Sequence, residues 1–291
     1  MTKIFVFPGQ GSQAKGMGKN LFDRYPDLVA EANDILGYSI KTLCLENPNG
    51  DLIRTQFTQP ALFIVNALSY LARLEELGEK PAFVTGHSLG EYNALFVAEV
   101  FSFADGIRLV QRRGKLMSEV SDGAMIAVIG LNIEAIHDIL AENENKEIDV
   151  ANHNAPKQIV LAGPTEDLKA IALTCEKRSN VRVVSLNVGA AFHSRYMQPI
   201  KNAFGAFIAG FSFKAPMLPV IANLTALPYR DDEISHNLVQ QIDHTVRWVE
   251  SIQYLMQETN ANFEEIGYGN ILSKLINEIS MVTLPNKAVG R

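Results

Sequence analysis

The chain has 291 residues, of which 26 are Lys or Arg and 32 are Asp or Glu, so its formal net charge is −6. This balance disfavours a protein whose main partner is a nucleic acid or an anionic membrane. Hydrophobic residues make up 47% and charged residues 20%, which is typical of a folded protein and excludes a mainly disordered chain. The length predicts one large domain or two domains.

Two cysteines, Cys44 and Cys175, are too few for a disulfide scaffold and lack the paired spacing of a zinc or iron–sulfur site. We interpret them as reduced core thiols and expect no metal. The apolar run near the N-terminus, Ile4 to Phe7, is shorter than the core of a signal peptide. Longer apolar segments are interrupted by charged residues. We therefore expect a cytoplasmic protein without a membrane segment.

Short apolar runs bounded by Gly, Pro or Asn alternate with longer stretches of helical periodicity. The short runs predict strands at 3–7, 81–86, 218–222 and 262–267. The periodic stretches predict helices at 25–36, 60–77, 104–120, 195–208 and 246–257, with Pro60 as the first residue of its helix. This alternation is typical of an α/β fold with a parallel sheet covered by helices.

The middle of the chain has a different order of predicted strands and helices. It predicts, in order, a strand at 124–129, a helix at 133–142, strands at 148–152 and 158–162, a helix at 166–177 and a strand at 182–187. This βαββαβ order is the ferredoxin-like signature. We expect a small ferredoxin-like subdomain, 123–188, inserted into a large catalytic α/β domain made of 1–122 and 189–291, with a ligand cleft between the two.

Residues 86–90, Gly-His-Ser-Leu-Gly, fit the G-x-S-x-G nucleophile elbow. A predicted strand precedes this segment and a helix-forming run follows it from Glu91. Such a turn lifts the serine hydroxyl clear of the sheet, and the helix N-terminus provides amide donors for developing negative charge. A glycine-rich turn without chemistry is the alternative. We predict that Ser88 is a nucleophile.

A serine nucleophile needs a general base, and His193 is the best placed of the six histidines. It stands in a small-residue segment where the chain returns from the insertion to the large domain. His87 would point away from the serine in an elbow. Because no Asp or Glu stands out as the third member of a triad, we predict a Ser–His dyad whose imidazole is oriented by a backbone carbonyl.

The glycine-rich loop at 7–13, Phe-Pro-Gly-Gln-Gly-Ser-Gln, follows the first predicted strand. It lacks the Lys-Ser/Thr pair of a phosphate-binding loop, and an ordinary tight turn is one interpretation. If Ser88 is the nucleophile, a better role is an oxyanion hole made by the backbone amides of Gln10 and Leu89.

Arg113 falls within the apolar stripe of the helix predicted at 104–120, whereas its other cations share the opposite face. A buried guanidinium is costly unless it meets an anion or other acceptors. Arg113 therefore either meets a structural carboxylate or backbone carbonyls, or it holds a substrate carboxylate through two parallel hydrogen bonds. The sequence favours neither role over the other.

Together these motifs resemble the malonyl-CoA:acyl carrier protein transacylases and the acyltransferase domains of polyketide synthases. The resemblance extends from residue 1 to about residue 280 and implies a hydrolase-like large domain with a ferredoxin-like insertion. The matching segments, in the family's order, are Phe-Pro-Gly-Gln-Gly-Ser-Gln at 7–13, Thr-Gln-Pro-Ala at 58–61, Gly-His-Ser-Leu-Gly-Glu at 86–91, Arg-Gly-Lys-Leu-Met at 113–117, Asn-Ala-Pro at 154–156 with Gln158, Ala-Phe-His-Ser at 191–194 and Val-Arg-Trp at 246–248.

The resemblance implies that Ser88 carries the acyl group, that His193 is its base and that Arg113 clamps the malonyl carboxylate. The implied activity moves malonyl from malonyl-CoA through a seryl ester to the phosphopantetheine thiol of an acyl carrier protein, with no bound cofactor. The implied partners are this carrier protein and a small acyl-CoA. Segments at 37–40, 56–60 and 66–71 look most like the freestanding enzymes that serve polyketide synthases in trans.

The resemblance also implies roles around the reacting pair. The amides of Gln10 and Leu89 would form the oxyanion hole, the carbonyl of Arg247 would orient the histidine, and Phe192 would disfavour a methyl group at C2 of the malonyl. One departure is Gly-Tyr-Gly-Asn at 267–270, where the family usually has Gly-Pro-Gly-Lys. Malonyl loading for fatty acid synthesis, an acyl hydrolase that clears carrier proteins, and a noncatalytic scaffold are the alternatives.

Overall fold

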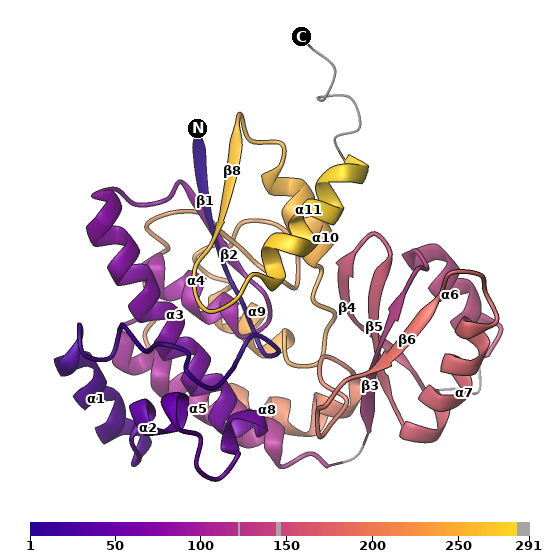
Figure 1. The fold of residues 1–291 in the computed structure, drawn as a ribbon, viewed down its shortest axis with the longest axis horizontal. Coiled ribbons are helices and arrows are strands. Elements are labelled where there is room, and N and C mark those ends of the chain that lie inside the picture. The colour runs from indigo at the N-terminus through magenta and orange to yellow at the C-terminus, as the bar shows by residue number, and fades with distance from the viewer. Residues whose placement is uncertain (122, 144–146, 284–291) are drawn as a thin grey trace.

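The computed structural model describes residues 1–121, 123–143 and 147–283, which form a larger and a smaller α/β part side by side (Figure 1). The larger part contains a four-stranded parallel sheet in the order β7-β2-β1-β8. The smaller contains a four-stranded antiparallel sheet in the order β4-β5-β3-β6. The predicted α/β fold, with a parallel sheet and a second sheet from the middle of the chain, is confirmed. The expected boundary at residue 122 and the end of the large domain at 284–291 lie outside the described residues.

The parallel sheet is buried on both faces because β1, at its centre, is apolar at every position from Ile4 onward. Ile4 and Val6 pack in one cluster with Trp248, and Phe5 and Phe7 pack in another on the opposite face. Two hydrophobic layers therefore sandwich the sheet, as expected for parallel strands. The strands are β1 (Thr2–Phe7), β2 (Phe83–Gly86), β7 (Val220–Ile221) and β8 (Ala261–Glu265).

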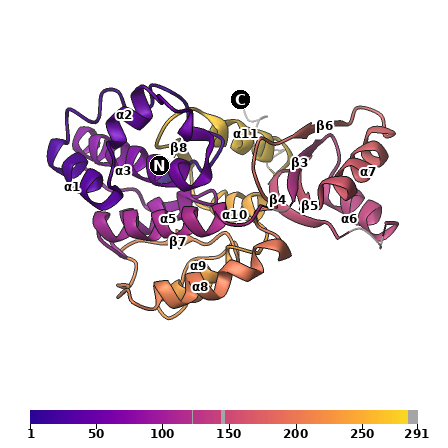
Figure 2. The same cartoon turned by 90° about the horizontal axis from the view of Figure 1, so that it is seen from below.

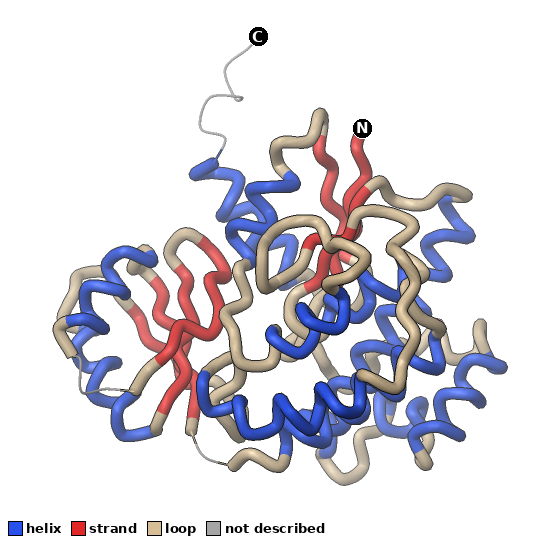
Figure 3. The backbone as a smooth tube through the Cα atoms, turned by 180° about the vertical axis from the view of Figure 1, so that it is seen from behind, coloured by secondary structure: helices blue, strands red, loops and turns tan. Residues whose placement is uncertain are grey.

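Helices cover both faces of this sheet (Figure 3). On one face α4 lies against β1 and β2, with α3 and α5 packed beyond it; on the other, α10 and α11 share the cluster around Trp248. The helices are α1 (Pro26–Leu36), α2 (Ile40–Leu45), α3 (Thr55–Leu77), α4 (Gly90–Val97), α5 (Phe103–Ser118), α8 (Gln198–Ile208), α9 (Ile234–Gln240), α10 (Trp248–Leu255) and α11 (Ile271–Thr283), with short 3-10 turns at Asp51–Ile53 and Arg195–Met197.

The prediction that Pro60 begins its helix is wrong, because α3 begins at Thr55 and contains Pro60. The first turn closes when the amides of Phe57 and Thr58 donate to the carbonyl of Arg54. A proline this near the N-terminus removes only one intrahelical donor, so the helix tolerates it. The earlier start matters for the site because it places Gln59 on the helix.

The smaller part has its elements in the predicted order. They are β3 (Ala124–Ile129), α6 (Ile133–Ala141), β4 (Asp149–Ala155), β5 (Gln158–Gly163), α7 (Thr165–Glu176) and β6 (Arg182–Ser185). Both helices lie on the sheet face that points away from the larger part (Figure 2). Side chains alternate along β3, so Ile126 and Val128 pack against these helices, while Met125 and Ala127 join the core of the larger part.

Cys44 and Cys175 are buried and free, in agreement with their interpretation as core thiols. Burial raises the pKa of the Cys44 thiol to about 12 and also raises that of Cys175. Within the described residues, none of the helices combines the length and apolar character needed to cross a membrane.

Candidate active site

The turn between β2 and α4 has the geometry of a nucleophile elbow. Its central residue, Ser88, has a left-handed backbone with φ of +51°. The flanking glycines are required by close backbone contacts: a Cβ on Gly86 would lie 2.0 Å from the carbonyl group of Gly90, and a Cβ on Gly90 would lie 2.0 Å from the carbonyl oxygen of Phe7. The sequence therefore folds here into a turn that only glycines allow and that presents Ser88 at its apex.

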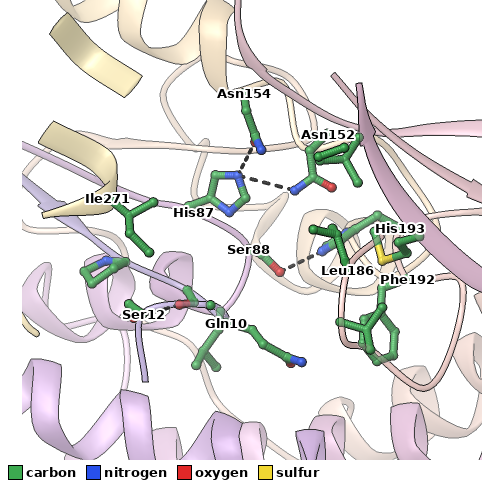
Figure 4. Close-up of a pocket in the computed structure, with 18 of the residues that line it drawn as sticks. Gln10, Ser12, His87, Ser88, Asn152, Asn154, Leu186, Phe192, His193 and Ile271 are labelled. Atoms are coloured by element: carbon green, nitrogen blue, oxygen red, sulfur yellow. Dashed lines mark hydrogen bonds between the residues drawn. The ribbon is translucent and has the colours of Figure 1, made fainter. Parts of the chain in front are cut away.

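Ser88 and His193 are in contact, as the sequence predicts for a dyad. The Oγ of Ser88 lies 2.7 Å from Nε2 of His193 (Figure 4). On the other side of the ring, Nδ1 lies 2.9 Å from the carbonyl oxygen of Gln241. Because a carbonyl can only accept, Nδ1 carries the hydrogen, and Nε2 is left with a lone pair directed at the serine hydroxyl.

The prediction that the carbonyl of Arg247 orients the histidine is wrong. That carbonyl accepts from the amide of Ser251 at 3.0 Å and from its hydroxyl at 2.9 Å. Arg247 caps the N-terminus of α10, so its carbonyl oxygen already belongs to the first turn of that helix. Gln241, just after α9, takes the role, and nothing in the sequence pattern distinguishes its carbonyl from others.

His193 is only 4% exposed. Burial, and next the nearby positive charge of Arg113, lower the pKa of its imidazole to about 3, while the hydrogen bond to Gln241 acts in the opposite direction. The ring is therefore neutral at ordinary pH. A neutral imidazole with a free Nε2 can act as a general base towards Ser88.

The loop after β1 lies directly on the elbow. A Cβ on Gly9 would come 2.3 Å from the carbonyl oxygen of His87 and 3.5 Å from the amide nitrogen of Leu89. Gln10 and Leu89 line the same cavity. Within the described ranges, neither of their backbone amides has an intramolecular acceptor. Both amides are thus available at the place where the sequence predicts an oxyanion hole.

Arg113 is 1% exposed, and its charge is held by neutral groups. One terminal nitrogen donates to the side-chain oxygen of Gln59 at 2.7 Å; the other donates to that of Gln241 at 3.0 Å and lies 3.3 Å from the hydroxyl of Ser88. Its guanidinium also lies 5.5 Å from the ring centre of Tyr92. Among the described residues no carboxylate forms an ion pair with it, so the structural-carboxylate alternative is not observed.

A buried carboxylate that sequence reasoning missed lies beneath the elbow. Glu91 Oε2 accepts from the side-chain amide of Gln241 at 2.6 Å and from the backbone amide of Asn223 at 3.2 Å, and Oε1 accepts from the hydroxyl of Tyr229. Burial raises the pKa of Glu91 to about 7, while these donors oppose the rise. The only sequence signal was the position of Glu91 directly after the elbow.

The Ser–His pair opens on a cavity of about 260 Å³ between the two parts of the molecule. His87 also lines it, with its Nε2 2.7 Å from Oδ1 of Asn154 (Figure 4). Phe192, 6% exposed, lines this cavity and also a neighbouring cavity of about 370 Å³. The smaller part contributes Met125, Ala127, Asn152, Asn154, Gln158 and Val160. In the described part of the chain, no cluster of His, Cys, Asp and Glu could hold a metal.

Comparison with known proteins gives consistent matches over nearly the whole chain. Residues 4–278 match the acyl transferase domain family. Malonyl CoA-acyl carrier protein transacylase PksC of Bacillus subtilis, a polyketide biosynthesis protein, is 51% identical over 94% of this chain and 96% of its own length. Polyketide biosynthesis protein ThaF of Burkholderia thailandensis is 52% identical over 98% of this chain, which spans only 24% of ThaF. A malonyl transacylase solved in complex with its type II PKS acyl-carrier protein superposes with a TM-score of 0.91, at 34% identity, over 96% of this chain and 93% of that one.

Proposed function

This chain belongs to the acyl transferase domain family and, within it, to the malonyl CoA-acyl carrier protein transacylases, and from that premise we propose that it loads malonyl onto acyl carrier proteins of polyketide biosynthesis. Malonyl-CoA is the donor and the phosphopantetheine thiol of the carrier is the acceptor. The observation that carries the malonyl specificity is the buried guanidinium of Arg113, 3.3 Å from the Ser88 hydroxyl and held by neutral partners.

In the first half-reaction, the Oγ of Ser88 attacks the thioester carbonyl while Nε2 of His193 takes its proton. The amides of Gln10 and Leu89 donate to the oxyanion of the tetrahedral intermediate. Collapse of the intermediate expels the coenzyme A thiolate, which receives the proton from His193. Malonyl remains on Ser88 as an ester.

In the second half-reaction, His193 takes the proton of the phosphopantetheine thiol, and the resulting thiolate attacks the ester carbonyl. The Ser88 oxygen leaves and regains a proton from His193, so the enzyme returns to its starting state. No cofactor takes part in either half-reaction. Water is the competing nucleophile, and the proposal requires that the carrier thiol reacts faster.

The positive charge of Arg113 accounts for selection of malonyl over acetyl. A guanidinium can form two parallel hydrogen bonds to a carboxylate. The carboxylate is negatively charged, whereas the side-chain oxygens of Gln59 and Gln241 are neutral acceptors. A bound carboxylate would also offset the positive field that helps to lower the pKa of His193. Binding of malonyl would therefore make the histidine a stronger base at the moment it is needed.

We assign 1–122 and 189–291 to a hydrolase-like large domain and 123–188 to a ferredoxin-like subdomain. The strand–elbow–helix unit at Ser88 supports the first description. The strand order β4-β5-β3-β6, with α6 and α7 on one face, supports the second. A cytoplasmic location is supported by the buried unpaired cysteines and by coenzyme A as substrate.

Intact-protein mass spectrometry after brief exposure to malonyl-CoA, acetyl-CoA or methylmalonyl-CoA tests the proposal, with Ser88→Ala as the control. We expect a malonyl adduct that requires Ser88 and disappears when a holo carrier protein is added, as the carrier gains the same mass. An adduct lost to water instead would identify a hydrolase. Absence of any adduct would leave a noncatalytic scaffold. Competition between polyketide and fatty acid carriers tests the pathway.

A further inference from the structure

Asn223, which follows β7, bonds to both sides of the nucleophile elbow. Its Oδ1 accepts from the backbone amide of Ser88 at 2.7 Å, and its Nδ2 donates to the carbonyl of Gly86 at 2.7 Å. The carboxamide orientation is unambiguous because an amide N–H only donates and a carbonyl only accepts. One side chain therefore bridges the residues on either side of His87.

This bridge begins where the sheet ends. The β2–β7 pairing stops at Thr85 and Ile221, so on the β7 side no strand backbone is left to pair with the elbow. On the other side, the carbonyl of Phe7 at the end of β1 still accepts from the amide of His87 at 2.9 Å. The carboxamide of Asn223 supplies a donor and an acceptor in the manner of a neighbouring strand. The parallel ladder is in effect extended by a side chain past its last backbone pair.

Asn223 is itself immobilised, which a positioning group requires. It is fully buried, its backbone amide donates to Oε2 of Glu91 at 3.2 Å, and its carbonyl accepts from the amide of Arg247 at 3.2 Å. Because water has no access, the two side-chain hydrogen bonds cannot be replaced by solvent without a rearrangement.

A non-glycine residue in the left-handed region is strained and persists only where its surroundings determine it. Ser88 is such a residue, with φ of +51°. We propose that Asn223 is a positioning residue that holds Ser88 in this conformation, from which its Oγ reaches Nε2 of His193. Asn223 acts through the backbone and does not contact the substrate. The inference rests on the proposed function only in taking Ser88 as the nucleophile.

The substitution Asn223→Asp tests this role with a distinctive pH signature. An ionised aspartate still accepts from the Ser88 amide but sets a second acceptor against the Gly86 carbonyl. A protonated aspartic acid can donate to that carbonyl and so restores both hydrogen bonds. Burial and the neighbouring Glu91 favour this protonated form. The defect should therefore shrink as the pH falls.

The matched control is Asn93→Asp. Asn93 is also fully buried, its Oδ1 accepts from Asn66 at 3.1 Å, and its Nδ2 donates to the carbonyl of Phe63 at 2.8 Å. The change there likewise keeps the acceptor and sets a carboxylate against a backbone carbonyl, but it touches neither Gly86 nor Ser88.

The readout is the second-order rate at which a small alkyl fluorophosphonate labels Ser88, measured by intact mass. The serine oxygen bonds to phosphorus, the P–F bond breaks, and the serine proton leaves through His193 with the fluoride. Since the reagent carries neither malonyl nor coenzyme A, it reports on Ser88 even if the proposed malonyl transfer is wrong. Loss of labelling in Ser88→Ala confirms the site of reaction.

We expect Asn223→Asp to lower the labelling rate at least tenfold relative to the unmodified protein at pH 8, with recovery at lower pH, and Asn93→Asp to change it less than twofold. Should Asn223→Asp not fold, Asn223→Ala, which adds no charge, should show the same loss without the recovery. An unchanged rate in a folded Asn223 variant, or equal losses in the Asn223 and Asn93 variants, would overturn the proposal.

Discussion

Ser88 and His193 both have left-handed backbones, with φ of +51° and +57°, and their side chains meet at 2.7 Å although 105 positions separate them in the chain. Each conformation is costly for a residue with a side chain. Hydrogen bonds to the two residues come from Asn223, which follows β7, and from Gln241, which follows α9. Gln241 contributes to both, because its side-chain amide donates to the Ser88 carbonyl at 2.9 Å and its own carbonyl binds His193. Gln241 therefore hydrogen-bonds to both of the strained reacting residues.

The transfer reaction should lose activity only at a pH well below the usual pKa range of histidine. Burial and the charge of Arg113 lower the pKa of His193 to about 3, so the base stays neutral as the pH falls. We expect kcat/KM for malonyl-CoA to remain nearly constant from about pH 7.5 to about pH 5. Initial rates over this range provide the check, and a twofold loss already near pH 6.5 would contradict it.

The same shift affects stability with a defined sign. Since the pKa of His193 is lower in the folded protein than in the unfolded chain, the unfolded chain binds the proton first. The free energy of unfolding should therefore decrease as the pH falls below about 6.5. Denaturant titrations of His193→Gln, a neutral side chain that cannot take up this proton, should show a weaker decrease over the same range.

Replacement of Arg113 should separate malonyl transfer from transfer of a neutral acyl group. In Arg113→Ala we expect malonyl transfer to fall roughly 100-fold, because a buried charge-assisted pair is worth about 3 kcal/mol. Acetyl transfer has no carboxylate to lose and should fall much less. Parallel assays with both coenzyme A thioesters test this, and equal losses would remove the carboxylate clamp from the mechanism.

Phe192 should exclude a substituent at C2 of the malonyl group. Its side chain lines both the active-site cavity and the neighbouring cavity of about 370 Å³, so Phe192→Ala should widen the active-site cavity on that side. We expect the methylmalonyl to malonyl ratio of kcat/KM to rise by about tenfold, the scale of one methyl group in a filled pocket. Phe207→Ala, on α8 away from both cavities, is the control; no change in the ratio for Phe192→Ala would refute the assignment.

Glu91→Gln should stabilise the protein, and more so at higher pH. The pKa of Glu91 is raised to about 7 in the folded state, so the folded protein binds its proton more tightly than the unfolded chain and loses this stabilisation as the pH rises from about 4.5 through about 7. Glutamine does not ionise, so the variant avoids that loss. The gain in the free energy of unfolding has an upper limit of about 3 kcal/mol. Thermal unfolding at pH 5 and pH 8 measures the difference; a greater gain at pH 5 than at pH 8 would reverse the sign.

The sequence predicted most of the fold because its elements are locally marked. The elbow glycines lie between an apolar strand and a helix, and the strands and helices of the smaller part follow one another in the predicted order. The start of α3 was misplaced because proline is a common first helical residue, and α2, α9 and α11 were not predicted.

The reacting groups were predicted because they belong to distinctive motifs, whereas the residues that hold them in position were not predicted. Ser88, His193 and Arg113 stand in recognisable segments. Gln241 acts partly through a backbone carbonyl, which every residue has, and Asn223 acts only because the sheet brings it beside the elbow. Contacts of this kind depend on three-dimensional pairing and leave no periodicity in the chain.

The antiparallel sheet lies in the chain between Arg113 and His193, yet it supplies only wall residues such as Met125, Ala127 and Val160. The serine, the histidine, the arginine and the amides that support them all come from outside it. The antiparallel sheet therefore lines one side of the cavity, while the residues that react and the specificity residues Arg113 and Phe192 lie in other stretches of the chain. Substitutions at the inward positions of this sheet can change the shape of that side of the cavity without altering Ser88, His193 or Arg113.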